Sequence, residues 1–241
     1  MAEIERSRTT EDTLFGGAVA LAQPARGGGY RVNVDAILLA SFAGGVLGET
    51  RSVRRARAAF DLGAGVGAVG LSLLHLEAAE RVTMIEVDAA LARLASKNAR
   101  ANGWESRIDV IRADVSDRDS VPAGAADLVV CNPPYVAPGR GRVPAAAHAR
   151  ARSGPLGAFL DAARRLAGRR ARVCFVYPAI EATTLLTELR QRGLEPKRLR
   201  AVHGAPRRGG GRARIVLVEA VAGRPGGLAI EPPYFELTAQ S

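Results

Sequence analysis

The sequence predicts a doubly wound, mainly parallel α/β sheet of seven strands. From residue 58 onward, short segments rich in β-branched and apolar residues alternate with longer segments of helical periodicity. A glycine-rich turn follows the first of these strands and opens a helix. The length of 241 residues, with 47% hydrophobic and 24% charged residues, suits one globular unit. We therefore expect one α/β domain over residues 58–241, with an N-terminal extension over 1–57 that packs on its ligand site.

The N-terminal extension has the pattern of a hairpin followed by a helix. Gly16-Gly17 separates two short apolar runs within residues 13–31, which indicates a β-hairpin and a loop. Asp35 precedes an apolar run over residues 36–42 and is expected to cap this helix at its N-terminus. Gly44-Gly45 is expected to end the helix.

The remainder of the chain alternates between strands and helices. The predicted strands span residues 58–62, 81–86, 107–112, 126–131, 172–177, 199–203 and 213–220, and the predicted helices span 66–78, 89–102, 155–166 and 179–192. This order predicts parallel strands with right-handed crossovers. Because a loop and no helix joins the last two strands, one of them is expected to run antiparallel.

The net charge of +10 is concentrated in one stretch of the chain. Lys97 and Lys197 are the only lysines, so 32 of the 34 basic residues are arginine. Residues 139–214 hold 18 basic and 4 acidic residues, whereas the rest of the chain holds 16 basic and 20 acidic residues. A segregated positive field of this size is typical of proteins that bind nucleic acid. The alternative is a solvated arginine-rich surface that has no partner.

Composition also excludes several classes of protein. Cys131 and Cys174 are too few for a disulfide framework, so we expect reduced thiols. No apolar run approaches the roughly 20 residues of a membrane span, and the first residues lack the plan of a signal peptide. His148 and His203 are isolated, so we expect no metal site. A cytoplasmic protein that acts without a metal is therefore predicted.

The glycine-rich turn over residues 61–67 is a candidate cofactor loop. Gly63 and Gly65 allow the backbone to turn tightly and to approach a ligand that a Cβ atom would repel. The overlapping glycine pattern over residues 65–70 also fits a dinucleotide site. Asp61 at the head of the turn favours the zwitterionic amino-acid group of S-adenosylmethionine, because a carboxylate repels a pyrophosphate.

Two further carboxylates are expected to contact this cofactor. Glu86 closes the second strand, about twenty residues beyond the glycines, where a carboxylate can accept hydrogen bonds from both ribose hydroxyls. Asp114 follows the third strand and could accept from the exocyclic amine of the adenine. Asp88 is instead assigned to the N-cap of the next helix.

The sharpest motif is the run Asn132-Pro133-Pro134-Tyr135, directly after the fourth strand. Two prolines make the turn rigid and remove two backbone donors, which leaves carbonyl oxygens as acceptors. The Asn132 side-chain oxygen and the Pro133 carbonyl can accept the two hydrogens of a planar amino group, while Tyr135 stacks on the flat substrate. These residues predict methyl transfer to an sp² amine, and a plain Asn-Pro turn is the alternative.

Together these motifs resemble the class I S-adenosylmethionine-dependent methyltransferases, whose fold is Rossmann-like. The segment over residues 30–40 is similar to one in the bacterial valine-tRNA adenine N6-methyltransferases, where it covers the bound cofactor. The resemblance implies cofactor contacts from Arg31, Asp35 and Asn132. It also implies that the substrate is an adenine beside the anticodon of a tRNA.

The basic stretch is then expected to bind RNA around an extruded base. The candidate residues are Arg140, Arg142, Arg150, Arg152, Arg207 and Arg208. Two other enzymes remain open: a glutamine N5-methyltransferase of release factors and a guanine N2-methyltransferase of ribosomal RNA. The third alternative is an RNA-binding protein on an inactive methyltransferase fold. We expect no membrane partner, and a monomer or a homodimer.

Overall fold

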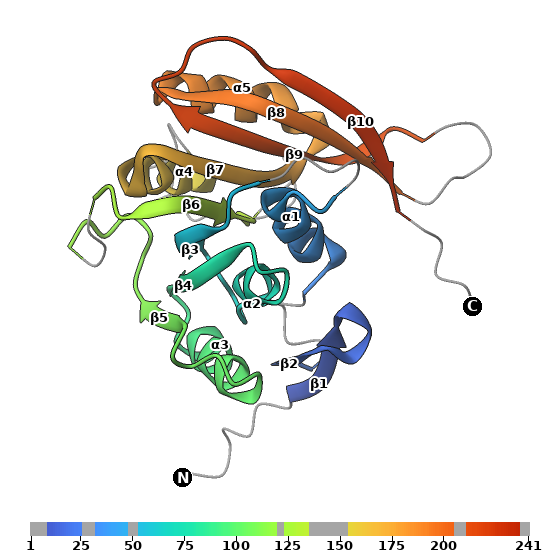
Figure 1. Cartoon of the computed structure of the whole chain (residues 1–241), viewed down its shortest axis with the longest axis vertical. Helices are drawn as coiled ribbons and strands as arrows, with labels where there is room; N and C mark the ends of the chain where they lie inside the picture. The colour runs from blue at the N-terminus through green and yellow to red at the C-terminus, as the bar shows by residue number, and fades with distance from the viewer. Residues whose placement is uncertain are drawn as a thin grey trace, which may run out of the picture. The chain divides into compact units, whose positions relative to one another are not determined.

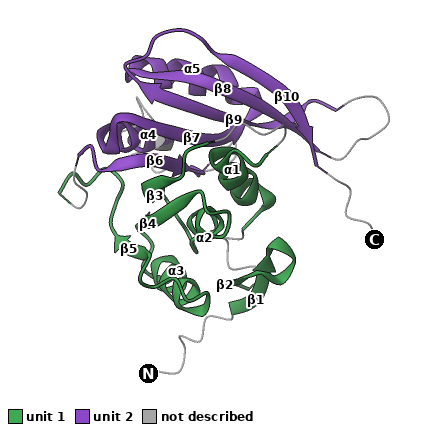
Figure 2. Ribbon diagram, viewed as in Figure 1, with its two compact units in different colours: residues 1–120 green, residues 121–241 purple. Residues whose placement is uncertain are grey.

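The computed structural model describes residues 9–25, 32–47, 53–119, 123–134, 154–204 and 211–236. The chain divides into two compact units, residues 1–120 and residues 121–241 (Figure 2). The first unit therefore contains the predicted N-terminal extension together with the first part of the predicted α/β domain.

The first unit holds a hairpin and a three-stranded parallel arrangement (Figure 1). Its elements are β1 (Thr9–Leu14), β2 (Val19–Pro24), α1 (Val34–Gly44), β3 (Ala56–Leu62), α2 (Ala68–His75), β4 (Ala79–Glu86), α3 (Ala89–Ala101) and β5 (Ile108–Arg112). β4 pairs in parallel with β3 on one side and with β5 on the other. Helices α2 and α3 connect these strands, as predicted, and the buried side chains of Leu62, Met84 and Ile85 contribute to the core.

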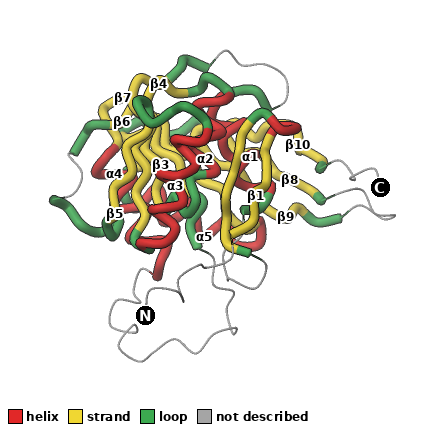
Figure 3. Tube along the Cα trace, turned by 90° about the horizontal axis from the view of Figure 1, so that it is seen from below, coloured by secondary structure: helices red, strands yellow, loops and turns green. Residues whose placement is uncertain are grey.

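The predicted hairpin is confirmed, and it pairs apart from the other strands of the first unit (Figure 3). Its first strand begins at Thr9, four residues before the predicted start, and a 3-10 turn over Phe15–Gly17 joins the strands. Gly16 adopts a φ of 65° in this turn, which glycine tolerates without steric cost.

Helix α1 begins two residues earlier than predicted, which corrects the assignment of its cap. Asn33 is the N-cap, and its side-chain oxygen accepts a hydrogen bond from the Asp35 N–H at 3.1 Å. Asp35 lies in the first turn, where a carboxylate interacts favourably with the helix dipole. The helix ends at Gly45 in the left-handed conformation, as predicted.

Close packing between α2 and β4 explains two glycines of the motif. A Cβ atom at Gly67, which has a φ of 88°, would lie 2.9 Å from the Met84 sulfur. A Cβ atom at Gly70 would lie 2.4 Å from the Met84 methyl carbon and 3.1 Å from a Val82 methyl carbon. These two glycines therefore let the helix approach the strand, whereas Gly63 and Gly65 shape the turn itself.

The second unit contains five paired strands in the order β10-β8-β9-β7-β6. Its elements are β6 (Ala126–Cys131), α4 (Gly154–Leu166), β7 (Ala167–Pro178), α5 (Ala182–Gln191), β8 (Leu194–His203), β9 (Ala213–Ala222) and β10 (Ala229–Phe235). β9 runs antiparallel to both β7 and β8, as predicted for one of the last two strands. The pairs β6–β7 and β8–β10 are parallel, so two of the four strand pairs of this unit are parallel and two are antiparallel.

Strand β10 was not predicted, so the described strands outside the hairpin number eight, one more than the expected seven. Pro232 and Pro233 argue against a strand, because proline cannot donate to a strand ladder. β10 pairs only with β8 among the described strands, and its register shifts between Glu231 and Tyr234, where the prolines lie. An edge strand tolerates prolines because one side needs no hydrogen-bond partner.

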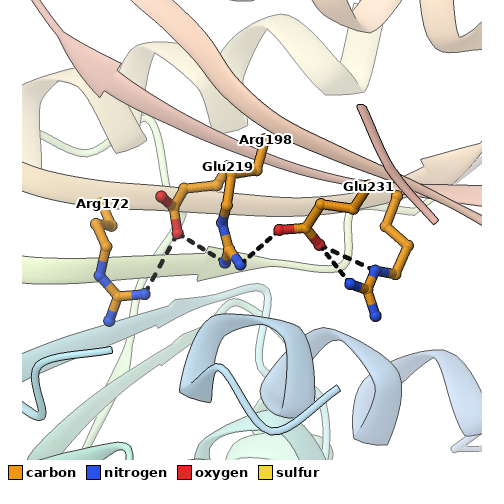
Figure 4. Close-up of polar contacts among 5 residues, drawn as sticks. Arg172, Arg198, Glu219 and Glu231 are labelled. Atoms are coloured by element: carbon orange, nitrogen blue, oxygen red, sulfur yellow. Dashed lines mark hydrogen bonds and ion pairs between the residues drawn. The ribbon is translucent and has the colours of Figure 1, made fainter. Parts of the chain in front are cut away.

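Five charged side chains form a continuous chain of ion pairs across the strands of the second unit (Figure 4). Glu219 lies 3.4 Å from Arg172 and 3.0 Å from Arg198, measured between oxygen and nitrogen. Glu231 lies 3.1 Å from Arg198 and 2.8 Å from Arg200. Arg198, Arg200 and Glu219 are buried, so this chain of charges fixes β7, β8, β9 and β10 side by side.

The described part of the chain holds neither a membrane-crossing helix nor a metal cluster. None of the described helices has the length and apolar character needed to cross a bilayer. Within the same residues, no cluster of three or more His, Cys, Asp or Glu side chains is arranged to hold a metal ion.

Candidate functional site

The glycine-rich turn of the first unit is anchored to the neighbouring strand by its own backbone. The N–H groups of Gly63 and Ala64 both donate to the Ile85 carbonyl, at 2.9 and 3.0 Å. Gly63 and Gly65 have φ values of 67° and 58°, in the left-handed region that favours glycine. The turn is therefore held in a fixed shape at the carboxyl ends of β3 and β4, where ligands of open α/β sheets bind.

Asp61 is a buried carboxylate at the head of this turn. Its Oδ2 accepts a hydrogen bond from the Gly70 N–H at 2.9 Å. Its Oδ1 is buried and has no hydrogen-bond partner among the described residues. Burial raises the pKa of Asp61 to about 7, the Gly70 hydrogen bond opposes this rise, and the charge of Glu86 adds to it. Asp61 therefore retains the capacity to accept a hydrogen bond from a cationic ligand group.

Glu86 holds the middle of the turn. Its Oε2 accepts from the Gly65 N–H and its Oε1 from the Asp88 N–H, both at 2.8 Å. Glu86 is buried, with 7% of its surface exposed. A carboxylate oxygen has two acceptor sites, so each oxygen keeps the capacity to accept a second hydrogen bond. The two backbone bonds fix the orientation of the carboxylate, and its predicted role at a ribose remains a prediction.

Two of the three remaining cofactor residues predicted in this unit have local structural roles. Asp114 is exposed, and its Oδ1 accepts from the N–H and the hydroxyl of Ser116, at 2.8 and 2.6 Å. Asp35 is buried in the first turn of α1, and its Oδ2 accepts from the side-chain amide of Asn33 at 2.9 Å. Arg31 lies outside the described residues.

The predicted amine-binding turn begins at the end of a strand of the second unit. β6 spans Ala126–Cys131, which are the predicted bounds, and Asn132 follows it directly. Asn132 is partly exposed, Pro133 is buried and Pro134 is exposed. Tyr135 lies outside the described residues, and the predicted role of this turn remains a prediction.

The structure accounts for much of the basic stretch over residues 139–214 in another way. Six of its twelve described basic residues have a carboxylate partner: Arg172, Arg190, Arg192, Arg198, Arg200 and Arg214. The six arginines that we predicted to bind RNA all lie outside the described residues. Part of the local charge is therefore neutralised within the protein, and the net positive count overstates the field available to a partner.

The prediction missed two residues around the glycine-rich turn. Val87 has 61% of its surface exposed directly after Glu86, where an apolar side chain can pack against a flat ring. The sequence pattern that could have identified Val87 is an apolar residue between the carboxylate that ends the strand and the residue that caps the next helix. Asn98 is a buried residue of α3 whose side-chain amide donates to the Val66 carbonyl within the turn at 2.9 Å. Its signal is a polar residue on the buried side of an amphipathic helix.

The comparisons with known proteins agree with this geometry. The family model of the methyltransferase small domain matches residues 42–151. The tRNA1(Val) (adenine(37)-N6)-methyltransferase of Aeromonas hydrophila is 34% identical over 160 residues, which are 65% of this chain and 63% of that protein. The chain thus spans less than two thirds of the length of this relative.

Two solved structures share the fold. A predicted O-methyltransferase of Agrobacterium tumefaciens has a TM-score of 0.62 at 24% identity, covering 86% of this chain and 89% of that chain. M. jannaschii TYW2, solved in complex with AdoMet, has a TM-score of 0.56 at 16% identity, covering 88% of this chain and 84% of that chain. The fold class predicted from the sequence is confirmed, and the predicted resemblance agrees with the family model and with the Aeromonas relative. Residues 42–151 are therefore similar to the methyltransferase small domain, within a chain that has the α/β fold of these two solved structures.

Proposed function

We propose that the protein uses S-adenosylmethionine to methylate the N6 amine of an adenine in tRNA, beside the anticodon. The observation that carries this proposal is the Asn132-Pro133-Pro134 turn directly at the carboxyl end of β6. Carbonyl and amide oxygens on a rigid turn suit a planar amino group. The similarity to the tRNA1(Val) (adenine(37)-N6)-methyltransferase of Aeromonas hydrophila supports adenine in tRNA as the substrate.

The residues of the glycine-rich turn fit S-adenosylmethionine. The buried Oδ1 of Asp61, which has no partner among the described residues, suits an ammonium group. The spare acceptor capacity of Glu86 suits the ribose hydroxyls, and the exposed side chain of Val87 suits the flat adenine ring. The AdoMet complex of M. jannaschii TYW2 also supports this cofactor. When bound, S-adenosylmethionine supplies an electrophilic methyl group.

The chain contributes positioning and electrostatics to the transfer. Acceptance of both N6 hydrogens, by the Asn132 side-chain oxygen and the Pro133 carbonyl, orients the amine and increases the electron density on its nitrogen. Tyr135 stacks on the base and keeps it extruded. With the methyl donor bound, these contacts would direct the lone pair of the amine toward the methyl group, and the surplus proton of the amine would pass to water.

The bases of a structured RNA must be extruded before they reach such a turn, and cations are needed for the adjacent phosphates. We assign this role to the six predicted arginines at positions 140, 142, 150, 152, 207 and 208. The Arg140 and Arg142 pair follows the Asn-Pro-Pro turn within ten residues, so it is the first pair to test. The natural location for such an enzyme is the cytoplasm.

One experiment tests substrate and chemistry together. The protein is incubated with S-adenosylmethionine labelled in its methyl group and with either total tRNA or a release factor, and the products are digested and analysed. We expect label in N6-methyladenosine from tRNA. Ribosomal RNA is included as a third substrate. Label in glutamine of the release factor, or in N2-methylguanosine of ribosomal RNA, would contradict the proposal.

A further inference from the structure

The outer edge of the hairpin is bonded by side chains of helix α3 rather than by another strand. The Ala22 N–H donates to Oδ1 of Asn98 at 2.7 Å, and Nδ2 of Asn98 donates to the Ala22 carbonyl at 2.9 Å. The Ala20 N–H donates to Oδ1 of Asn102 at 2.9 Å, and Nδ2 of Asn102 donates to the Ala20 carbonyl at 2.8 Å. Two side-chain amides therefore make the hydrogen bonds that the backbone of a neighbouring strand would otherwise make.

The spacing of these residues explains why a helix can replace a strand here. Asn98 and Asn102 are four residues apart on α3, a rise of about 6.0 Å along a helix axis. Ala20 and Ala22 are two residues apart on β2, a rise of about 6.7 Å along a strand. Because these two spacings are similar, each asparagine amide lies opposite the N–H and the carbonyl of one residue at the hairpin edge. The edge of the hairpin is thereby satisfied over these two positions.

The two asparagines differ in their third hydrogen bond. The second Nδ2 hydrogen of Asn98 is donated to the carbonyl of Val66, in the middle of the glycine-rich turn, at 2.9 Å. The corresponding hydrogen of Asn102 is donated to the Asn98 carbonyl of its own helix at 2.8 Å. Asn98 is 1% exposed, so its amide is shielded from water. One buried side chain thus joins the hairpin to the turn.

We propose that Asn98 is a positioning residue that couples the N-terminal hairpin to cofactor binding. If the buried amide of Asn98 lost either Val66 or Ala22 as a partner, a polar group would be left without a hydrogen bond. The backbone groups of Val66 and Ala22 are therefore held in one preferred position relative to each other. Ordering of the turn by a ligand therefore favours a docked hairpin, and a docked hairpin favours the ordered turn, by the same factor. This inference rests on the proposed use of S-adenosylmethionine.

The matched pair of variants Asn98→Ala and Asn102→Ala tests the coupling. Each removes two hydrogen bonds to one residue of the hairpin, but only Asn98→Ala releases the turn. We expect the Kd for S-adenosylhomocysteine, measured by calorimetry, to rise about tenfold in Asn98→Ala and less than about twofold in Asn102→Ala, as the loss of one buried hydrogen bond predicts. Equal Kd values for the two variants would overturn the proposal.

Hydrogen exchange supplies a readout that a purely structural role would not move. In the wild-type protein, S-adenosylhomocysteine should slow exchange of the Ala20 and Ala22 amides as well as that of the Gly65 amide. In Asn98→Ala the hairpin amides should no longer respond. If the ligand slows exchange of the Gly65 amide but not of the Ala20 and Ala22 amides in the wild-type protein, the coupling is contradicted and the cofactor assignment is not. The absence of protection at Gly65 would contradict the cofactor assignment.

A variant on the hairpin side keeps the proposal testable if Asn98→Ala does not fold. Ala22→Pro removes the N–H that donates to Asn98, but leaves Asn98 and its bond to Val66 in place. An edge strand tolerates proline where its N–H faces away from the partner strand. Because the Asn98 amide still donates to the carbonyl of residue 22, the cofactor should slow exchange at Ala20 less than in the wild-type protein, and slowing equal to that of wild type would overturn the coupling.

Discussion

Glu86 holds one amide of the glycine-rich turn, and Asp61 holds one amide in the first turn of the helix α2 that follows it. Asp61 accepts the N–H of Gly70 at 2.9 Å, and Glu86 accepts the N–H of Gly65 at 2.8 Å. Both carboxylates are buried near the carboxyl ends of neighbouring parallel strands. They shape the turn before any ligand arrives, and this preorganisation lowers the cost of binding.

Replacement of Asp61 by asparagine should stabilise the protein at alkaline pH. Burial raises the pKa of Asp61 from 3.8 to about 7, so its contribution to folding stability is full below about pH 4 and is lost as the pH rises through 7. The side chain of the Asp61→Asn variant has no charge to bury. The free energy of unfolding of the variant, relative to wild type, should therefore increase between about pH 4 and pH 8, by up to about 4 kcal/mol. Urea denaturation at both pH values measures this change, and a difference that is independent of pH would contradict it.

Glu86→Gln should weaken cofactor binding. The Gln amide can accept from only one of the two N–H groups that Glu86 now holds, and it presents a donor to the other. The Kd for S-adenosylmethionine should rise by about 10- to 100-fold, in line with the loss of a charged hydrogen-bond acceptor. Glu80→Gln is the matched control, because Glu80 is an exposed carboxylate of the same strand. A similar Kd for both variants would argue against the role of Glu86.

Asn132→Ala should abolish methyl transfer and leave cofactor binding nearly unchanged. The loss of an oriented acceptor typically lowers kcat by about 100- to 1000-fold. Single-turnover kinetics with saturating tRNA measures the chemical step, and calorimetry with S-adenosylhomocysteine measures cofactor affinity. Methyl transfer at the wild-type rate would show that Asn132 is part of a plain Asn-Pro turn with no role in the reaction.

The double variant Arg140→Ala, Arg142→Ala should bind tRNA with a flatter salt dependence. The slope of log K against log salt should fall by about 2, one unit for each lost phosphate contact. The control is Arg169→Ala, Arg170→Ala, which removes two exposed arginines of the same basic stretch near the start of β7. If both double variants lower the slope equally, the binding is a general effect of net charge.

Glu231→Gln should destabilise the protein more than Glu236→Gln. Glu231 neutralises Arg198 and Arg200, which are 5% and 6% exposed, so its loss leaves buried charge on β8. We expect a loss of about 1 to 3 kcal/mol in the free energy of unfolding, against less than about 1 kcal/mol for Glu236, whose partner Arg214 is more exposed. Equal losses, measured by urea denaturation, would show that the buried chain of ion pairs does not hold β10.

The sequence by itself was sufficient for the order of the elements and for the location of the motifs. Local patterns placed β6 at its observed bounds and placed the glycine-rich turn between a strand and a helix. Asp88 was correctly assigned as a helix cap, because a cap depends only on the next three residues. Strand β10 was missed because its prolines contradict the local pattern, and only its place at an edge makes them acceptable.

Only the tertiary structure decided the environment of each polar group. Asn98 and its partner Ala22 are 76 residues apart, and Arg198 and Glu231 are 33 residues apart, so neither pair leaves a local signal. The raised pKa of Asp61 likewise depends on the burial that its neighbours in space provide. Periodicity and turn residues record interactions between near neighbours in the chain. Burial and pairing depend on which distant segments meet, and that is fixed only when the chain has folded.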